Sequence, residues 1–233
     1  MATPTQFTLP VSLEDSVSLD NFLLPDGLDA SLLTQLQNID LPVLYLYGST
    51  GSGVSHLLMS SVRQGSVCDQ YLPMAELLGS EAAVLQSIPL GGVIAIDDLE
   101  CLNELSENWC EALFDLYHRQ LDAGGVMRFG AHVAPQQLQI PLADLRSRIL
   151  SGPVWALPAP DETQVKKVLE ARAHARGFEM SDAVLSWLLT RETRNLGHLM
   201  QLLEKLDRMT LQQRRRLTVP FLAEWLGDQN VEE

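Results

Sequence analysis

Apolar and polar positions follow one another along the chain in blocks that predict strands and helices in turn. Three blocks are short and almost wholly apolar, which is typical of strands buried on both faces of a parallel sheet. They cover residues 43–47, 92–96 and 126–131. Two weaker blocks, residues 69–73 and 154–157, predict further strands.

Between these strands, leucines and other apolar residues recur at the three- and four-residue spacing of a helix. The expected helices cover residues 30–37, 54–63, 81–87, 109–123 and 142–149. Strands that alternate with helices indicate a parallel sheet with helices on its faces. The pattern therefore predicts an α/β fold.

The alternation ends at Pro158-Ala-Pro160, and the later apolar patterns all have helical spacing. Helices are expected from residue 161 or 162 to about 176, from a cap at Ser181, from about 195 to 209, and over 219–227. The first twenty residues lack periodicity. We therefore expect an extended arm (1–20), an α/β domain (21–158) and an all-helical domain (159–233).

Composition limits the kinds of protein that fit this plan. The chain has 233 residues, 46% of them hydrophobic, so it can bury a large core, and its net charge of −14 disfavours direct contact with nucleic acid. The three cysteines form no CxxC pair, which argues against a metal site and for a reducing compartment. With neither a signal-peptide pattern nor a membrane span, a cytoplasmic protein with protein partners is expected.

The strongest chemical signal is a glycine-rich loop between the first strand and the next helix. The spacing Gly48-x4-Gly53-x-Ser55 fits a phosphate-binding loop, except that Val54 stands where that pattern has lysine. The alternative is an ordinary glycine-rich turn. The candidate phosphate-binding residues are Gly48, Ser49, Thr50, Gly51, Ser52, Gly53, Val54, Ser55 and His56.

A second signal follows the strand at 92–96. Asp97 and Asp98 stand at its carboxyl end, where an acid beside a phosphate loop can hold Mg²⁺, although such a pair can also cap a helix. His132 follows the strand at 126–131 and is expected at the same sheet edge as Asp97. A single histidine there is more often structural than catalytic.

Taken together, these residues resemble the AAA+ module of the bacterial replication initiator DnaA. Within this family the chain is most similar to the short regulatory inactivators, because it stops after the helical lid and has neither the initiator's N-terminal domain nor its DNA-binding domain. The resemblance rests on the glycine-rich loop, Asp97-Asp98, Asp115-Leu-Tyr117, Leu145-x-Ser147-Arg148 and Arg191-x-x-Arg194-x-Leu196.

The resemblance implies a role for each matching residue. The loop and Asp98 would surround the nucleotide, Asp97 would be the Walker B acid, and Mg²⁺ would bind at Ser55 and Asp97. Arg194 matches the sensor 2 arginine and Arg148 the arginine finger. Arg146, two residues earlier on the same helix, is expected to face solvent or to pair with an acid. The chain differs from the family at Val54, which replaces the lysine, and at His132, which replaces the polar sensor 1 residue.

The arm carries a further resemblance, to the peptide by which the regulatory inactivators bind the replicative sliding clamp. The matching residues are Gln6, Phe7, Leu9, Pro10 and Val11, with Phe7 in place of a leucine. The alternative is that Phe7 and Leu9 simply pack on the domain.

The implied function is negative regulation of DNA replication initiation. On the DNA-loaded sliding clamp, the β subunit of DNA polymerase III, such a protein stimulates ATP hydrolysis by DnaA, which leaves inactive ADP-DnaA. The chain itself is expected to bind ADP and to supply Arg148 in trans rather than to hydrolyse ATP. DNA would be reached through the clamp, no membrane is involved, and homodimer formation stays open. Two other readings stay open: an active P-loop ATPase similar to helicase loaders, and a clamp-binding adaptor without nucleotide.

Overall fold

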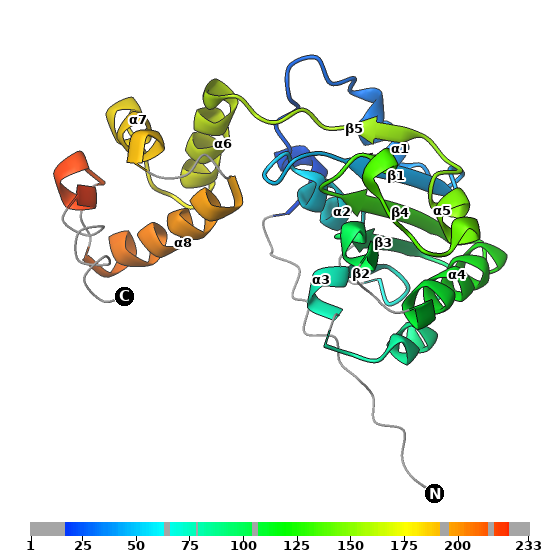
Figure 1. Cartoon of the computed structure of the whole chain (residues 1–233). Coiled ribbons are helices and arrows are strands. Elements are labelled where there is room, and N and C mark those ends of the chain that lie inside the picture. Colours follow the sequence, from blue (N-terminus) through cyan, green and yellow to red (C-terminus); the bar gives the residue numbers. More distant parts are fainter. Residues whose placement is uncertain are drawn as a thin grey trace, which may run out of the picture. The chain divides into compact units, whose positions relative to one another are not determined.

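The computed structural model describes residues 17–62, 66–77, 79–103, 107–191, 196–213 and 217–223. These residues belong to two compact units, and each is described by itself. Apart from the loop residues 50–52, the first unit extends to Pro158 and the second begins at Ala159 (Figure 1).

The first unit is built on a parallel sheet of five strands in the order β2-β3-β4-β1-β5. Every residue of β3 and β4 is buried, because these strands lie inside the sheet and are covered on both faces. Their continuous apolar runs made them predictable, and the predicted α/β fold is confirmed. The strands are β1 (Val43–Tyr47), β2 (Gln70–Pro73), β3 (Val93–Asp97), β4 (Val126–Ala131) and β5 (Val154–Ala156).

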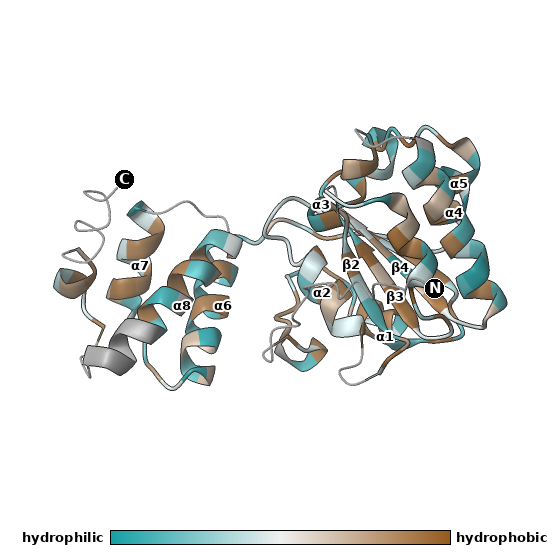
Figure 2. Cartoon of the chain, turned by 90° about the horizontal axis from the view of Figure 1, so that it is seen from below, coloured by the Kyte–Doolittle hydropathy of each residue, from teal (hydrophilic) through white to brown (hydrophobic). Residues whose placement is uncertain are grey.

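Helices cover both faces of the sheet, and the side chains of β1 alternate between the two cores (Figure 1). Val43 and Tyr45 pack with the helices α3, α4 and α5, whereas Leu44 and Leu46 pack with α1 and α2. Figure 2 shows the apolar residues concentrated along the sheet and on the helix faces that meet it. The α-helices are α1 (Ser31–Gln37), α2 (Val54–Ser61), α3 (Met74–Leu77), α4 (Glu107–Asp122) and α5 (Ala143–Ile149). The 3₁₀-helices are η1 (Leu19–Asn21), η2 (Ala82–Ser87), η3 (Leu99–Asn103) and η4 (Pro135–Gln137).

The second unit is helical, with a core of its own. It contains α6 (Glu162–Ala175), α7 (Asp182–Arg191) and α8 (Leu196–Gln213), and residues 219–223 are helical as well. The start of α6 is fixed by a capping box, in which Asp161 Oδ1 accepts from the Gln164 backbone N–H at 2.7 Å. The predicted cap at Ser181 is also present, since its hydroxyl accepts from the Val184 N–H at 3.4 Å. Within the described ranges no helix is long and apolar enough to cross a bilayer.

Some predicted elements differ from the structure. Residues 82–87 form the 3₁₀-helix η2 rather than an α-helix, because Pro89 holds Ile88 in an extended conformation and the segment buries only Leu85. The helix expected over 54–63 ends at Ser61, and Arg63 lies outside the described residues. At the other end of the chain, α8 continues four residues past the predicted position 209. The outer part of the predicted helix 219–227, residues 224–227, also lies outside the described ranges.

An arginine ties the first helix to the sheet. Arg128, in the middle of β4, has none of its surface exposed. Its guanidinium donates to the backbone carbonyls of Asn38 at 2.7 Å and Leu41 at 2.9 Å, and more weakly to that of Leu36. Burial lowers the pKa of Arg128 to about 10. Because Leu36 lies in the last turn of α1 and Asn38 and Leu41 lie between α1 and β1, the arginine holds the end of α1 and the α1–β1 connection against the sheet.

We expect Arg128→Ala to lower the free energy of unfolding by about 3 kcal/mol or more, since it leaves several buried carbonyls without donors and creates a cavity. Urea denaturation followed by circular dichroism measures this change. Arg119→Ala is the control, because Arg119 is more exposed: it pairs with Asp115 at 2.7 Å and donates to the part-buried Leu85 carbonyl at 3.0 Å, so its loss should cost about 1–2 kcal/mol. Equal losses in the two variants would contradict the role given to Arg128.

Candidate nucleotide-binding site

The loop between β1 and α2 has the backbone of a phosphate cradle. Gly51 and Gly53 have φ angles of +87° and +96°, which favour glycine, and Gly53 is the N-cap of α2 without any side-chain cap. A Cβ at Gly53 would lie 2.7 Å from the ring of Phe22. The first N–H groups of α2 are thus left uncapped by a side chain, and the helix dipole favours an anion beside them.

Two side chains of the loop decide what the cradle offers. Ser52 is buried, and its hydroxyl has no hydrogen-bond partner within the described part of the chain. A buried hydroxyl of this kind can donate to an anion. Val54 is 2% exposed and packs in the core with Leu57 and Leu58. The loop therefore fits a phosphate through neutral donors, while the position that usually carries lysine belongs to the core.

Asp97 ends β3 as a fully buried carboxylate. Its Oδ1 accepts the backbone N–H of Asp98 at 3.0 Å, and its Oδ2 accepts the hydroxyl of Tyr71 at 2.8 Å. Gly130 on the neighbouring strand β4 leaves room for it, since a Cβ there would lie 2.8 Å from Asp97 Oδ1 and 2.8 Å from Val54 Cγ1. The carboxylate is therefore held by β2 and accommodated by β4.

Tyr71 connects the two residues predicted to hold Mg²⁺. It pairs with Ala95 in the β2–β3 register, so its side chain reaches the face on which Asp97 lies two residues later. The phenol donates to Asp97, and on its other side the Ser55 side chain lies close enough to lower the pKa of the phenol. Burial and the charge of Asp97 raise the pKa of Tyr71 far above its ordinary value, against the opposite effect of Ser55. The role of Tyr71 was not predictable from the sequence, because the apolar periodicity of a strand does not show which other strand becomes its neighbour.

A second group of side chains lies at the same sheet edge. His132 stands there as predicted, and its Nδ1 lies 2.9 Å from Glu100 Oε1 and 3.6 Å from Asp98 Oδ1. Its backbone N–H also donates to Glu100. These ligand atoms all lie within 4.8 Å of one another, a set of donors that suits a cation. Glu100 was not identified from the sequence, since it lies in η3 beyond the strand end.

The pKa values of this group reflect its mutual charges. Burial and the neighbouring carboxylates Asp97 and Glu100 raise the pKa of Asp98 to about 6. The hydrogen bond to Glu100 raises the pKa of His132, and hydrogen bonds from His132 outweigh burial and lower the pKa of Glu100. The pair of His132 and Glu100 is thus favoured in its charged form.

The two arginines of α5 have different environments. Arg146 was expected to face solvent or to pair with an acid. This was wrong: its side chain is half-buried and donates to the backbone carbonyl of Pro135 at 3.1 Å. Arg148 is exposed, and its guanidinium makes no ion pair or hydrogen bond with the described residues.

Arg148 stands in the last turn of α5, which leads toward the end of β1 opposite the phosphate loop. Gly152, four residues later, lies against the carbonyl of Val43 at the start of β1. The phosphate loop follows Tyr47 at the other end of that five-residue strand, a separation of roughly 15 Å along the strand. Arg194 and the arm residues Gln6–Val11 lie outside the described residues, so the structure places neither.

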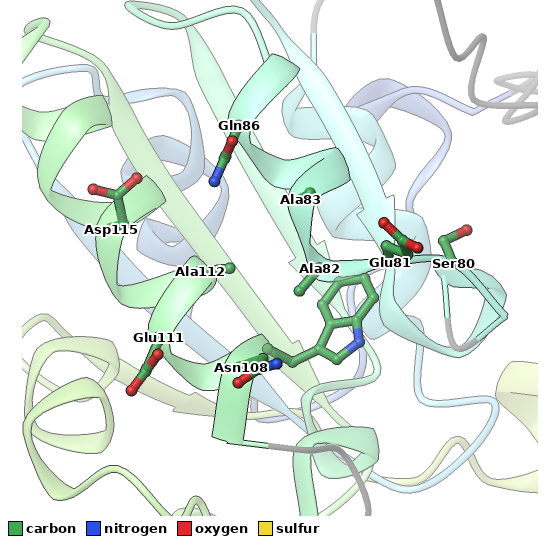
Figure 3. A pocket seen from close by; sticks show the side chains of 10 residues that line it. Ser80, Glu81, Ala82, Ala83, Gln86, Asn108, Glu111, Ala112 and Asp115 are labelled. Carbon is green, nitrogen blue, oxygen red and sulfur yellow. The ribbon is translucent and has the colours of Figure 1, made fainter. Parts of the chain in front are cut away.

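A separate hollow of about 610 Å³ lies between η2 and α4, on the face of the sheet opposite α2 (Figure 3). Apolar and acidic residues both line it, among them Trp109, Ala112, Glu81, Glu111 and Asp115. None of the predicted site residues takes part in it.

Comparison with known proteins identifies what this geometry is similar to. The family model "Hda, lid domain" matches residues 161–226. An uncharacterized protein of Haemophilus influenzae is 31% identical over 228 residues, which cover 95% of this chain and 98% of that protein. Domain III of the Thermotoga maritima replication initiation protein DnaA has the same fold, with a TM-score of 0.74, 21% identity, and coverage of 94% of this chain and 98% of that chain. AMPPCP-bound DnaA from Aquifex aeolicus is similar with a TM-score of 0.60 and 19% identity, covering 87% and 71% of the two chains.

We expect Gly130→Ala to lower the free energy of unfolding by about 1–3 kcal/mol, because the new methyl group meets Leu58, Val54 and the carboxylate of Asp97 at once. Thermal and urea denaturation measure the loss. Gly79→Ala is the control, since no atom lies within 4 Å of its Cβ position and its φ is not positive; it should be neutral or stabilise by up to about 1 kcal/mol. A Gly130→Ala variant as stable as the wild type would refute the tight approach of β4 to Asp97.

Proposed function

The chain belongs to the Hda-like, DnaA-related family of AAA+ proteins, and we propose that it is a replication regulator with a specific activity. This activity is to inactivate the initiator DnaA. Held in the cytoplasm on the DNA-loaded sliding clamp, it stimulates hydrolysis of the ATP bound to DnaA. The product is inactive ADP-DnaA, so that replication does not start again too early. The family membership supports DnaA as the partner, and the exposed arginine of α5 supports the stimulation of hydrolysis as the mechanism.

The observation that carries the proposal is the exposed guanidinium of Arg148. Residues 1–158 contain five Lys and Arg against 18 Asp and Glu. Of these five, Arg63 lies outside the described residues, Arg128 is buried in the sheet, Arg119 pairs with Asp115, and Arg146 is bonded to a backbone carbonyl. Arg148 thus presents a positive charge on an otherwise strongly acidic unit. Because it lies at the end of β1 away from the loop, it serves the nucleotide of another molecule.

In this mechanism Arg148 enters the nucleotide site of DnaA and neutralises the charge that develops on the transferred phosphoryl group. The attacking water and the metal ion belong to DnaA. An arginine supplied in trans accelerates related nucleotide hydrolases by roughly 10³–10⁵. The small helix α5 positions it, with Leu145 and Ile149 buried as anchors on either side in the sequence.

The chain's own loop has a different task in this proposal. Residues 48–56, with Asp98 and Arg194, hold ADP as a bound ligand that supports the fold. Nucleotide binding by DnaA structures is in keeping with this, since one holds AMPPCP and another holds AMPPCP with single-stranded DNA. A diphosphate suits a cradle of neutral donors better than a triphosphate does, because it carries less charge.

The clamp-binding part of the proposal concerns the arm. The arm joins the described residues beside α2, where the Ser18 carbonyl lies 3.0 Å from His56 Nε2. Gln6 can hydrogen-bond in a peptide pocket, while Phe7, Leu9 and Val11 offer apolar anchors and Pro10 lowers the entropy cost of ordering.

We expect deletion of residues 1–11 to abolish binding to the sliding clamp and to leave the melting temperature unchanged. Size-exclusion chromatography with purified clamp measures the first effect and differential scanning calorimetry the second. The double variant Phe7→Ala, Leu9→Ala in the full-length chain is the finer test and should weaken binding at least about tenfold, since it removes both apolar anchors. Co-elution of the shortened protein with the clamp would show that the arm does not bind it.

We expect Arg148→Ala to remove nearly all stimulation of DnaA hydrolysis in the presence of clamp-loaded DNA, a loss of about a hundredfold or more. Hydrolysis of radiolabelled ATP prebound to DnaA measures it. Clamp binding and thermal stability should be unchanged, because Arg148 is exposed and is not part of the proposed clamp peptide.

Arg146→Ala is the matched control on the same helix. It removes a hydrogen bond to Pro135 and should cost about 1 kcal/mol of stability while leaving most stimulation intact. If Arg146→Ala alone fails to stimulate, or both variants stimulate like the wild type, Arg148 is not the finger. Strong ATP turnover by the isolated chain would instead favour an active ATPase.

A further inference from the structure

We propose that this chain binds ADP without a divalent cation, because the hydroxyl of Tyr71 takes the place between Ser55 and Asp97 that Mg²⁺ would occupy. The inference rests on the proposed binding of ADP at residues 48–56 and states which cofactor that site uses. It replaces the expectation that Mg²⁺ binds at Ser55 and Asp97.

The donor set at this point is already occupied. Tyr71 donates to Asp97 Oδ2 at 2.8 Å, and its phenol lies beside Ser55, so the phenol stands between the two predicted metal ligands. Asp97 Oδ1 accepts the Asp98 N–H at 3.0 Å. Mg²⁺ requires near-octahedral oxygen ligands at about 2.0–2.1 Å. An ion bound directly to Ser55 and Asp97 would have to take the place of the phenol oxygen.

Moving the phenol is opposed by the strands around it. Tyr71 is fixed in register with Ala95, and Leu72 beside it is fully buried, so β2 cannot shift without exposing its core. On the other side, Gly130 holds β4 close against Asp97. A rotated Tyr71 would also leave Asp97, which is fully buried, without its side-chain donor.

The rest of the loop agrees with a site that works without a cation. Val54 puts an apolar side chain where lysine would supply charge, and the unpartnered hydroxyl of Ser52 offers a neutral donor. A triphosphate would lack both cations that usually balance its charge. A diphosphate at the start of α2 needs the helix N-terminus and neutral donors alone.

The test is isothermal titration with ADP in excess Mg²⁺ and again in EDTA. The wild-type dissociation constant should differ by less than about twofold between the two conditions. Tyr71→Phe opens the place between Ser55 and Asp97, so Mg²⁺ should now strengthen its ADP binding at least about fivefold. Tyr45→Phe is the matched control: it removes another tyrosine hydroxyl of the same sheet, one that donates to the Val133 carbonyl, and should behave as the wild type.

A wild-type affinity that rises tenfold or more with Mg²⁺ overturns the inference and leaves the proposed function intact. A Tyr71→Phe variant that is as indifferent to Mg²⁺ as the wild type overturns it as well.

A second experiment, carried out without nucleotide, distinguishes failure of this inference from failure of the proposed function. Electron paramagnetic resonance with Mn²⁺ alone should show one site more in Tyr71→Phe than in the wild type, and Asp97→Asn should remove that additional site. If the wild type binds no ADP in either condition, the nucleotide part of the proposed function fails, and the Mn²⁺ count still decides the inference. Equal Mn²⁺ counts in the wild type and Tyr71→Phe overturn it. Circular dichroism melts of each variant establish that it is folded.

Discussion

The burial of one carboxylate constrains how the first unit is assembled. Asp97 stands at the end of a strand in the interior of the sheet with none of its surface exposed, and a charge in such a place costs several kcal/mol unless hydrogen bonds compensate it. The compensation comes from Tyr71 on β2 and from the backbone of Asp98, and Gly130 on β4 supplies the space. Three adjacent strands are thereby adjusted to a single side chain.

Features that depend on local sequence were predictable, whereas contacts between neighbouring strands, such as those around Asp97, were not. The strands β1, β3 and β4 were predictable because burial on both faces leaves continuous apolar runs, and the caps at Asp161 and Ser181 followed from local chemistry. Tyr71 and Glu100 were not, because their roles depend on which strands and turns become neighbours. Arg146 was misjudged for the same reason, since Pro135 approaches it only in the folded chain.

The distribution of charge also has a physical logic. The phosphate loop has Val54 in place of the usual lysine, and the guanidinium of Arg128 is buried in the sheet, where it donates to backbone carbonyls. Arg148 at the opposite end of β1 is the cation that the described α/β unit leaves open to another molecule. In the proposed complex, the loop contributes stability and the far end of the sheet contributes the chemistry. A single AAA+ fold can in this way act on a neighbour's nucleotide without turning over its own.

The attachment of Ser18 to His56 sets a length scale for the proposed complex. Between the clamp peptide, which ends at Val11, and this anchor lie six residues, and a chain of that length spans at most about 20 Å. So short a linker keeps the domain within a small volume around the clamp. For a DnaA molecule bound beside that clamp, the effective concentration of the domain is then in the millimolar range, on the order expected for short linkers. Glycine and serine residues inserted between the clamp peptide and Ser18 would lower this local concentration while leaving the peptide itself and the Ser18–His56 contact in place.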